Sequence, residues 1–204
     1  GNTAGVAIAT GAGATSVSGI GTITATAVGG VGIQAATVTG NVAIGGSGVV
    51  LGGAGILVTA AATTPGGIDS GSVSILRGGS VTGNAVVANP ATPYLGSQGD
   101  GIHVVTNGGS IEIGTMSSVA GTANAIWART GGTGNETQIL NAGTIRIHDI
   151  GTLGSAGGLD SALRGWGGGG VTVENIGTIT GGLDGIHMTA IGTPITSYFL
   201  AQNI

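Results

Sequence analysis

The sequence contains no cysteine and no lysine, and it has few aromatic residues. Among 204 residues the aromatic side chains are Tyr94, Trp127, Trp166, Tyr198 and Phe199. Without cysteine the chain has neither disulfide bonds nor thiolate metal ligands, and this absence does not distinguish between cellular compartments. Without large rings the interior has to be filled by valine, isoleucine, leucine and alanine, which favours a narrow core packed in layers.

Charge is equally scarce. Four arginines are scattered along the chain against eight acidic residues, and residues 1–68 carry no Asp, Glu, Lys or Arg. Nucleic acid binding requires clustered basic residues on one face, so we expect neither DNA nor RNA as a partner. Disordered chains combine low hydrophobicity with high net charge, whereas this chain is apolar, so we expect it to fold.

No apolar run is long enough to cross a membrane as a helix. The stretch 48–62 is interrupted by Gly52, Gly53 and Gly55, and it is shorter than the ~20 apolar residues that a spanning helix needs. The first residues also lack the basic segment and apolar run of a signal peptide. We therefore expect no transmembrane segment in this chain, which we take as a mature product or a fragment of a longer precursor.

Glycine, by contrast, is abundant, with 47 residues, and it recurs in a seven-residue phrase. The phrase is an apolar residue, any three residues, glycine, serine or threonine, and a second apolar residue. Its copies run over 17–23, 75–81, 105–111, 139–145 and 173–179, and the glycines of the last three stand 34 residues apart each time. Such regularity is typical of stacked repeats.

We predict that the glycine of each copy turns a corner of the coil. The apolar residues on either side would then point inward from two adjacent faces, and the serine or threonine would bond nearby backbone groups at the bend. No catalytic role is needed to explain the phrase. The predicted structural corners are Gly21, Gly79, Gly109, Gly143 and Gly177.

Seven short runs repeat one strand-like pattern. They cover 5–8, 32–35, 55–58, 85–88, 101–104, 125–128 and 185–188. Apolar alternation over four or five residues between glycines predicts β-strands, and no segment keeps a helical period with caps. At ~20–30 residues per coil, the sequence predicts an all-β, right-handed parallel β-helix (β-solenoid) of about seven to nine coils with almost no α-helix.

We expect residues 1–204 to form a single β-solenoid with three parts. Residues 1–68 make uncharged coils rich in Gly, Ala, Val and Thr, residues 69–193 make more regular coils, and residues 194–204 form a tail or cap. Prolines, polar residues or consecutive glycines interrupt the pattern near 88–99, 131–137 and 167–170. These three segments are predicted loops on one side of the rod.

The candidate surface contacts come from the repeats and the loops. In Asp100-Gly-Ile-His103 and Asp184-Gly-Ile-His187 each histidine lies opposite an inward isoleucine, so both should face solvent. Trp127 holds the equivalent position; an outward tryptophan stacks on a sugar or anchors a protein contact, and equally it plugs a coil end or covers a loop base. The candidates are Tyr94, His103, Trp127, Trp166, His187, Tyr198 and Phe199.

Metal and cofactor sites are not indicated. The Gly-Gly-Ile/Leu-Asp phrases at 66–69, 157–160 and 181–184, with a variant that ends at Asp100, are neither complete nor tandem copies of a calcium-binding nonapeptide. We interpret their aspartates as acceptors of backbone hydrogen bonds at turns. No histidine pair has metal-ligand spacing, and His148 beside Asp149 is interpreted as a solvated loop pair. We expect no metal and no cofactor.

Polysaccharide cleavage is the lesser alternative to a non-enzymatic role. An inverting hydrolase needs two carboxyls roughly 6.5–9.5 Å apart, and a lyase needs a base with a cation or metal. The sequence has no lysine and no tight carboxylate cluster. Because the candidate residues recur, they also favour repeated structure over one active site, and we expect no catalytic residue.

The repeats carry a family resemblance. Its motifs are Asn141-Ala-Gly-Thr-Ile145, Asn175-Ile-Gly-Thr-Ile179 followed by Thr180-Gly181-Gly182, and the Asp-Gly-Ile phrases. With them the chain resembles, over nearly its whole length, the passenger (β-helix) region of bacterial type V autotransporters and related β-strand-repeat adhesins. The resemblance implies export across the outer membrane and a stalk or adhesive surface at the cell exterior, with a host or neighbouring-cell surface or a polysaccharide as partner.

A self-assembling subunit of an extracellular filament or surface layer is the main alternative. The open ends of a β-helix expose unpaired strand edges, which end-to-end stacking of copies would satisfy. The uncharged residues 1–68 suit burial against neighbouring chains, since a protein alone in water is expected to carry surface charge.

Overall fold

The computed structural model describes residues 4–27, 29–60, 71–84, 99–130, 143–156, 163–167, 170–182 and 184–190. Within these ranges every regular element is a β-strand and none is a helix, as the sequence predicts. The described part of the chain thus offers no helix that could span a membrane.

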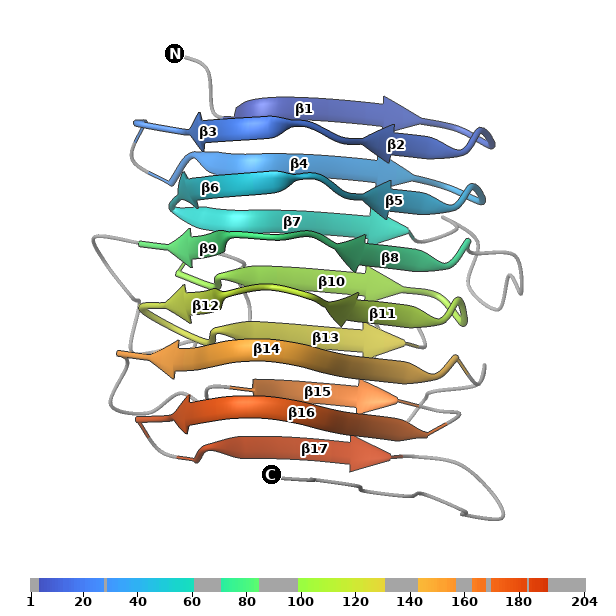
Figure 1. The fold of residues 1–204 in the computed structure, drawn as a ribbon. Helices are drawn as coiled ribbons and strands as arrows, with labels where there is room; N and C mark the ends of the chain where they lie inside the picture. The colour runs from blue at the N-terminus through green and yellow to red at the C-terminus, as the bar shows by residue number, and fades with distance from the viewer. Residues whose placement is uncertain are drawn as a thin grey trace.

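The strands form two parallel sheets, here called sheet A and sheet B (Figure 1). Sheet A is seven-stranded and takes one strand from each coil in chain order. Its strands are β1 (Ala4–Thr10), β4 (Val31–Thr37), β7 (Ala54–Ala60), β10 (Ile102–Thr106), β13 (Ile126–Thr130), β15 (Leu163–Gly167) and β17 (Ile186–Ala190).

Sheet B has two halves along its strands. The first half contains β2 (Thr15–Val17), β5 (Val42–Ile44), β8 (Val73–Leu76) and β11 (Ile111–Gly114). The second half contains β3 (Ile20–Thr24), β6 (Ser47–Gly52), β9 (Ser80–Gly83) and β12 (Ser118–Gly121). Two long strands, β14 (Ile145–Ser155) and β16 (Val171–Thr180), run through both halves, since β14 pairs with β11 and with β12 and β16 pairs with β14.

Each coil passes along sheet A, turns into sheet B and returns to sheet A one strand further on. Neighbouring strands pair in parallel with equivalent residues in register, so that Ile33 pairs with Ile56, Ile56 with Ile102 and Ile102 with Ile126. Figure 1 shows the resulting stack from the N-terminus to the C-terminus. The predicted parallel β-helix is confirmed, and the seven strands of sheet A correspond to the lower end of the predicted seven to nine coils.

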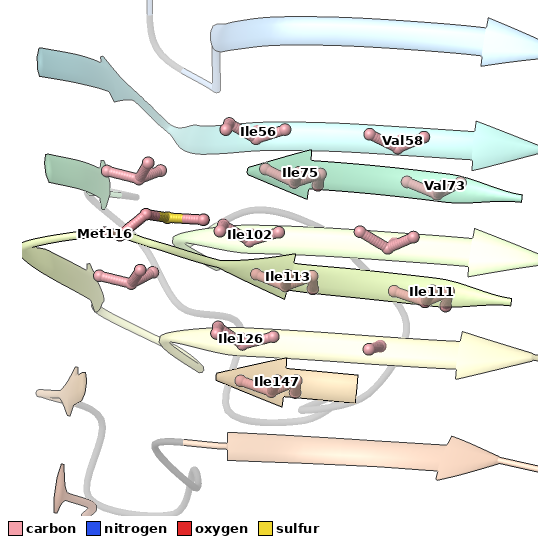
Figure 2. Packing of buried hydrophobic residues seen from close by; sticks show 14 of the residues in the cluster. Ile56, Val58, Val73, Ile75, Ile102, Ile111, Ile113, Met116, Ile126 and Ile147 are labelled. Carbon is pink, nitrogen blue, oxygen red and sulfur yellow. The ribbon is translucent and has the colours of Figure 1, made fainter. Parts of the chain in front are cut away.

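The core consists of columns of branched aliphatic side chains. Inward residues of sheet A face inward residues of sheet B between the two sheets (Figure 2). Fully buried members of two facing columns are Ile56, Ile102 and Ile126 from sheet A and Ile75, Ile113 and Ile147 from sheet B. Each such side chain contributes about 1.5–3 kcal/mol by leaving water, so the repetition of one residue type replaces large rings as the source of stability.

The glycine phrase occupies two different places in the coil, so the expected corner between sheets is found at Gly109 and Gly143 but not at Gly21 and Gly177, which lie inside strands. Gly109 and Gly143 lie just before β11 and β14, at the turn from sheet A into sheet B. Gly79 lies between β8 and β9, whereas Gly21 and Gly177 lie inside β3 and β16. The last three belong to the boundary between the two halves of sheet B.

Close stacking of backbones explains why glycine is selected at both places. Gly21 pairs directly with Gly48 of the next coil. A Cβ on Gly177 would lie 2.5 Å from the carbonyl oxygen of Gly151, and Gly79 has a φ of 83°, which favours glycine. The glycine of the seven-residue phrase therefore marks positions where only a small residue fits, and these positions are not all at one corner.

The first described coil is less buried than the middle of the solenoid. Val6, Val17 and Ile23 point toward the core but are only partly buried. Strand β1 is an edge of sheet A, with β4 as its neighbour. Within the described residues, the inward side chains of the first coil are thus less buried than those of the middle coils.

Candidate functional site

The outer face of sheet A brings three of the candidate contact residues into one column. His103 pairs with Trp127, Trp127 with Arg164, and Arg164 with His187. The alternation within β10, β13 and β17 places His103, Trp127 and His187 on the face opposite the inward Ile102, Ile126 and Ile186. Sequence reasoning found the equivalence of the two histidines and Trp127 but missed Arg164, whose Leu-Arg-Gly segment lacks the Gly-Ile signature.

His103 and Trp127 do not present free surfaces. Their rings are stacked, with centroids 4.2 Å apart and an interplanar angle of 5°. The His103 side chain is 13% exposed and Trp127 is 8% exposed. The expectation that His103 faces solvent is thus wrong: strands ~4.8 Å apart in register hold planar side chains at stacking distance.

Asp100, which precedes β10, contacts the His103 ring of this stack. Its Oδ2 lies 2.8 Å from Nδ1 of His103, and its Oδ1 accepts hydrogen bonds from the backbone N–H and the Nδ2 of Asn124, at 3.0 and 2.9 Å. The carboxylate is buried. An aspartate in a repeat turn does accept a backbone hydrogen bond, as predicted, but the donor belongs to the next coil.

The second Asp-Gly-Ile-His copy repeats this geometry at the surface. Nδ1 of His187 lies 3.3 Å from Oδ2 of Asp184, and the His187 side chain is 45% exposed. His187 therefore faces solvent as expected. The two copies share the local pairing of Asp with His three residues later and differ in burial.

Sheet B carries a charged ladder that sequence reasoning missed. Arg146 donates from Nη1 to Glu112 at 3.0 Å and from Nε to Glu174 at 2.8 Å, so one guanidinium links three successive strands. The hydrogen bond to Glu174, with the charges of both carboxylates, raises the pKa of Arg146. Glu112 and Arg146 are 34 residues apart, the spacing of Gly109 and Gly143, and this was the available signal.

His148 extends the ladder and corrects another prediction. Its Nδ1 lies 2.8 Å from Oδ2 of Asp149 and its Nε2 lies 3.2 Å from Oε1 of Glu112. The side chain is buried in β14, so the expected solvated loop pair is wrong. Both residues lie within β14, and the alternation is interrupted beside Asp149, which has a φ of 53°, so that Ile147 and His148 are both buried while Asp149 is exposed.

Several candidates are not placed by the structure. Tyr94, Tyr198 and Phe199, the loop 131–137, the tail 194–204 and all of 88–99 except Gly99 lie outside the described residues. Trp166 lies in β15, where it pairs with Arg129 and Thr189 and so belongs to the column beside that of Trp127. Of the loop 167–170, Gly167 ends β15 and Gly170 precedes β16.

These arrangements act chemically as links between coils. Asp100 with Asn124, His103 with Trp127, and Arg146 with two glutamates each join neighbouring strands. Ser110 and Thr144 do the same, with a hydrogen bond of 3.1 Å between hydroxyls. Among the described residues no group of three or more His, Cys, Asp or Glu side chains is arranged to hold a metal ion.

No family model, no curated protein and no solved structure matches this chain.

Proposed function

We propose that the protein is a non-enzymatic structural or adhesive β-helix at the cell exterior, comparable to the stalk of an autotransporter passenger. The observation that carries the proposal is that the polar side chains of the solenoid bond one coil to the next. Asp100, His103 and Arg146 each contact a residue of a neighbouring coil through the side chain. Such cross-links stiffen a rod along its axis, which is what a stalk requires.

The adhesive part of the proposal concerns the outer face of sheet A. The His187 side chain is 45% exposed, it shares a column with His103 and Trp127, and it lies toward the C-terminal end of the described stack. We expect contact with a cell surface or a polysaccharide to involve this end. Trp127 is less suited to contact because it is buried.

A test measures particle shape and surface binding of the purified chain. Negative-stain microscopy with size-exclusion chromatography and light scattering should find monomeric rods, and labelled protein should bind cells or immobilised polysaccharide. His187→Ala should weaken binding at least about fivefold, whereas Thr22→Ala, an exposed change on sheet B at the other end, should leave it unchanged. Equal loss in both variants, or no binding to any surface, contradicts the adhesive role.

A filament subunit is the second candidate, favoured by the partly exposed interior of the first coil and the edge strand β1. In this case microscopy should find fibres. Ala7→Lys with Ala9→Lys would place two charges on exposed positions of the edge strand and should dissolve the fibres. Rods that remain monomeric at high concentration contradict this candidate and leave the stalk proposal standing.

A further inference from the structure

Arg77 is an arginine inside the solenoid. Val73 and Ile75 of β8 point into the core, and the alternation continues through Leu76, which is exposed, to Arg77, which is only 3% exposed. Arginine is almost never buried to this degree unless it is paired. Its position therefore requires an explanation.

Among the described residues, the guanidinium of Arg77 donates to main-chain carbonyl groups. Nη2 donates to the oxygen of Gly48 at 3.2 Å, and Nε makes a long contact of 3.4 Å with the oxygen of Gly78. None of the ion pairs among the described residues involves Arg77. Burial lowers the pKa of Arg77, since it takes the cation out of water.

Small residues make room for this side chain in the N-terminal coils. Ile20 pairs with Ser47, and the pairing of Val49 with Ser80 puts Ser47 beside Gly78 in the next coil. In later coils the same column holds Met116 and Ile150, both buried. Ser47 and Gly78 are thus smaller than the residues that hold this position in later coils.

Ser47 and Arg77, together with residues of the first described coil, line a cavity of about 460 Å³. Its apolar wall includes Val6, Ile8, Val17 and Ile23, and Arg77 is the charged residue among those that line it. Volumes of ~300–1,000 Å³ with apolar walls and one or two fixed polar groups are typical of small-molecule sites. The cavity thus combines a buried cation with aliphatic side chains and the hydroxyl groups of Ser16, Ser18, Thr22 and Ser47.

We propose that this cavity binds an aliphatic monocarboxylate, with the carboxylate on the Arg77 guanidinium and the hydrocarbon tail among the valine and isoleucine side chains of the first coil. The planar guanidinium fork matches a carboxylate and forms charge-assisted hydrogen bonds with it. The tail covers the half-buried Val6, Val17 and Ile23. Inorganic anions have the matching charge but leave these side chains uncovered.

A second copy of the chain could also place an acidic side chain in the cavity, but the same observations support this occupant less well. Residues 1–68 contain no acidic residue, so two N-terminal ends facing each other bring no carboxylate to either Arg77. A free carboxylate with its own tail satisfies the cation and the apolar wall together.

The test titrates the purified chain with sodium octanoate by isothermal titration calorimetry. Octanoate should bind with one site per chain, whereas acetate, which lacks the tail, and octylammonium, which reverses the charge, should bind at least tenfold more weakly. Arg77→Gln should weaken octanoate binding at least tenfold. Arg146→Gln removes an exposed arginine of sheet B and should change it less than twofold.

Further measurements keep the test decisive if Arg77→Gln does not fold. Val17→Phe retains Arg77 but narrows the cavity, and it should also abolish octanoate binding while circular dichroism stays that of the parent. Absence of binding at millimolar octanoate, or equal binding by the parent and either variant, overturns the proposal. A stable dimer of the parent chain that Arg77→Gln dissociates would overturn it too, because the cation would then serve a second copy.

Discussion

Asp100 illustrates how single polar residues of this chain hold coils together. The buried carboxylate binds His103 in its own coil and two N–H donors of Asn124 in the next coil. When a buried donor loses its acceptor, the free energy that was needed to remove the donor from water is no longer offset by a hydrogen bond. Asp184 forms the equivalent pair with His187 at the surface, where water replaces a lost partner.

Asp100→Ala should therefore lower the free energy of unfolding by about 2–4 kcal/mol. Asp184→Ala, the matched surface change, should lower it by less than about 0.5 kcal/mol. Urea unfolding followed by tryptophan fluorescence measures both. Similar losses in the two variants would show that burial of the Asp100 network does not matter.

At the scale of the elements, parallel strands in register decide which residues can be large. Equivalent side chains stack along the solenoid, so the core accepts the same branched residue again and again, as with Ile75, Ile113 and Ile147. Where backbones of successive coils approach most closely, no Cβ fits. Gly177 lies at such a place, whereas a Cβ on Gly154 of β14 would meet nothing within 4 Å.

Gly177→Ala should destabilise the protein by about 1–3 kcal/mol, since the added methyl group would press on the backbone of Gly151. Gly154→Ala should be neutral or slightly stabilising, because glycine weakens a strand interior. Thermal unfolding followed by circular dichroism compares the two glycine variants with the parent. The opposite order of midpoints would contradict the close approach of these coils.

At the scale of the whole molecule, a solenoid has contacts only between adjacent coils, and its stability is local. The middle coils are covered on both sides by neighbours, whereas in the first described coil Val6, Val17 and Ile23 remain partly buried. Coils at an uncovered end open at lower free energy than coils in the middle.

Backbone amides of β1 and β3 should therefore exchange with deuterium at least about tenfold faster than those of β10 and β11, which lie in the middle of their sheets. Hydrogen exchange followed by mass spectrometry of peptides gives the comparison. Protection of β1 equal to that of β10 would mean that the first coil is covered in solution.

Much of the fold could be predicted from the residues. The alternation in Gly32-Ile33-Gln34-Ala35 and Gly101-Ile102-His103-Val104 predicts strands with isoleucine inward, and both isoleucines are buried as expected. The equivalence of His103, Trp127 and His187 also follows from their common place in the repeat, and the register confirms it. These features depend on local pattern, which a sequence contains in full.

Other features depend on which residues the coils bring side by side. The stack of His103 on Trp127, the burial of His148 and the bridge of Arg146 to two glutamates join residues of different coils. Coil lengths differ, as the pairing of Ile56 with Ile102 and of Ile102 with Ile126 shows. The number of residues between motifs in the sequence therefore does not give the register between strands.

By itself the sequence determined that this chain forms stacked parallel strands with an aliphatic core, because periodic apolar residues and glycines allow little else. The tertiary structure decided what the polar residues do. In the sequence Arg77 is one of four scattered arginines, and only the folded structure shows that its side chain is buried and lines a cavity. The burial and the hydrogen-bond partners of the polar side chains depend on contacts between coils, and the register that brings the coils together exists only in the folded chain.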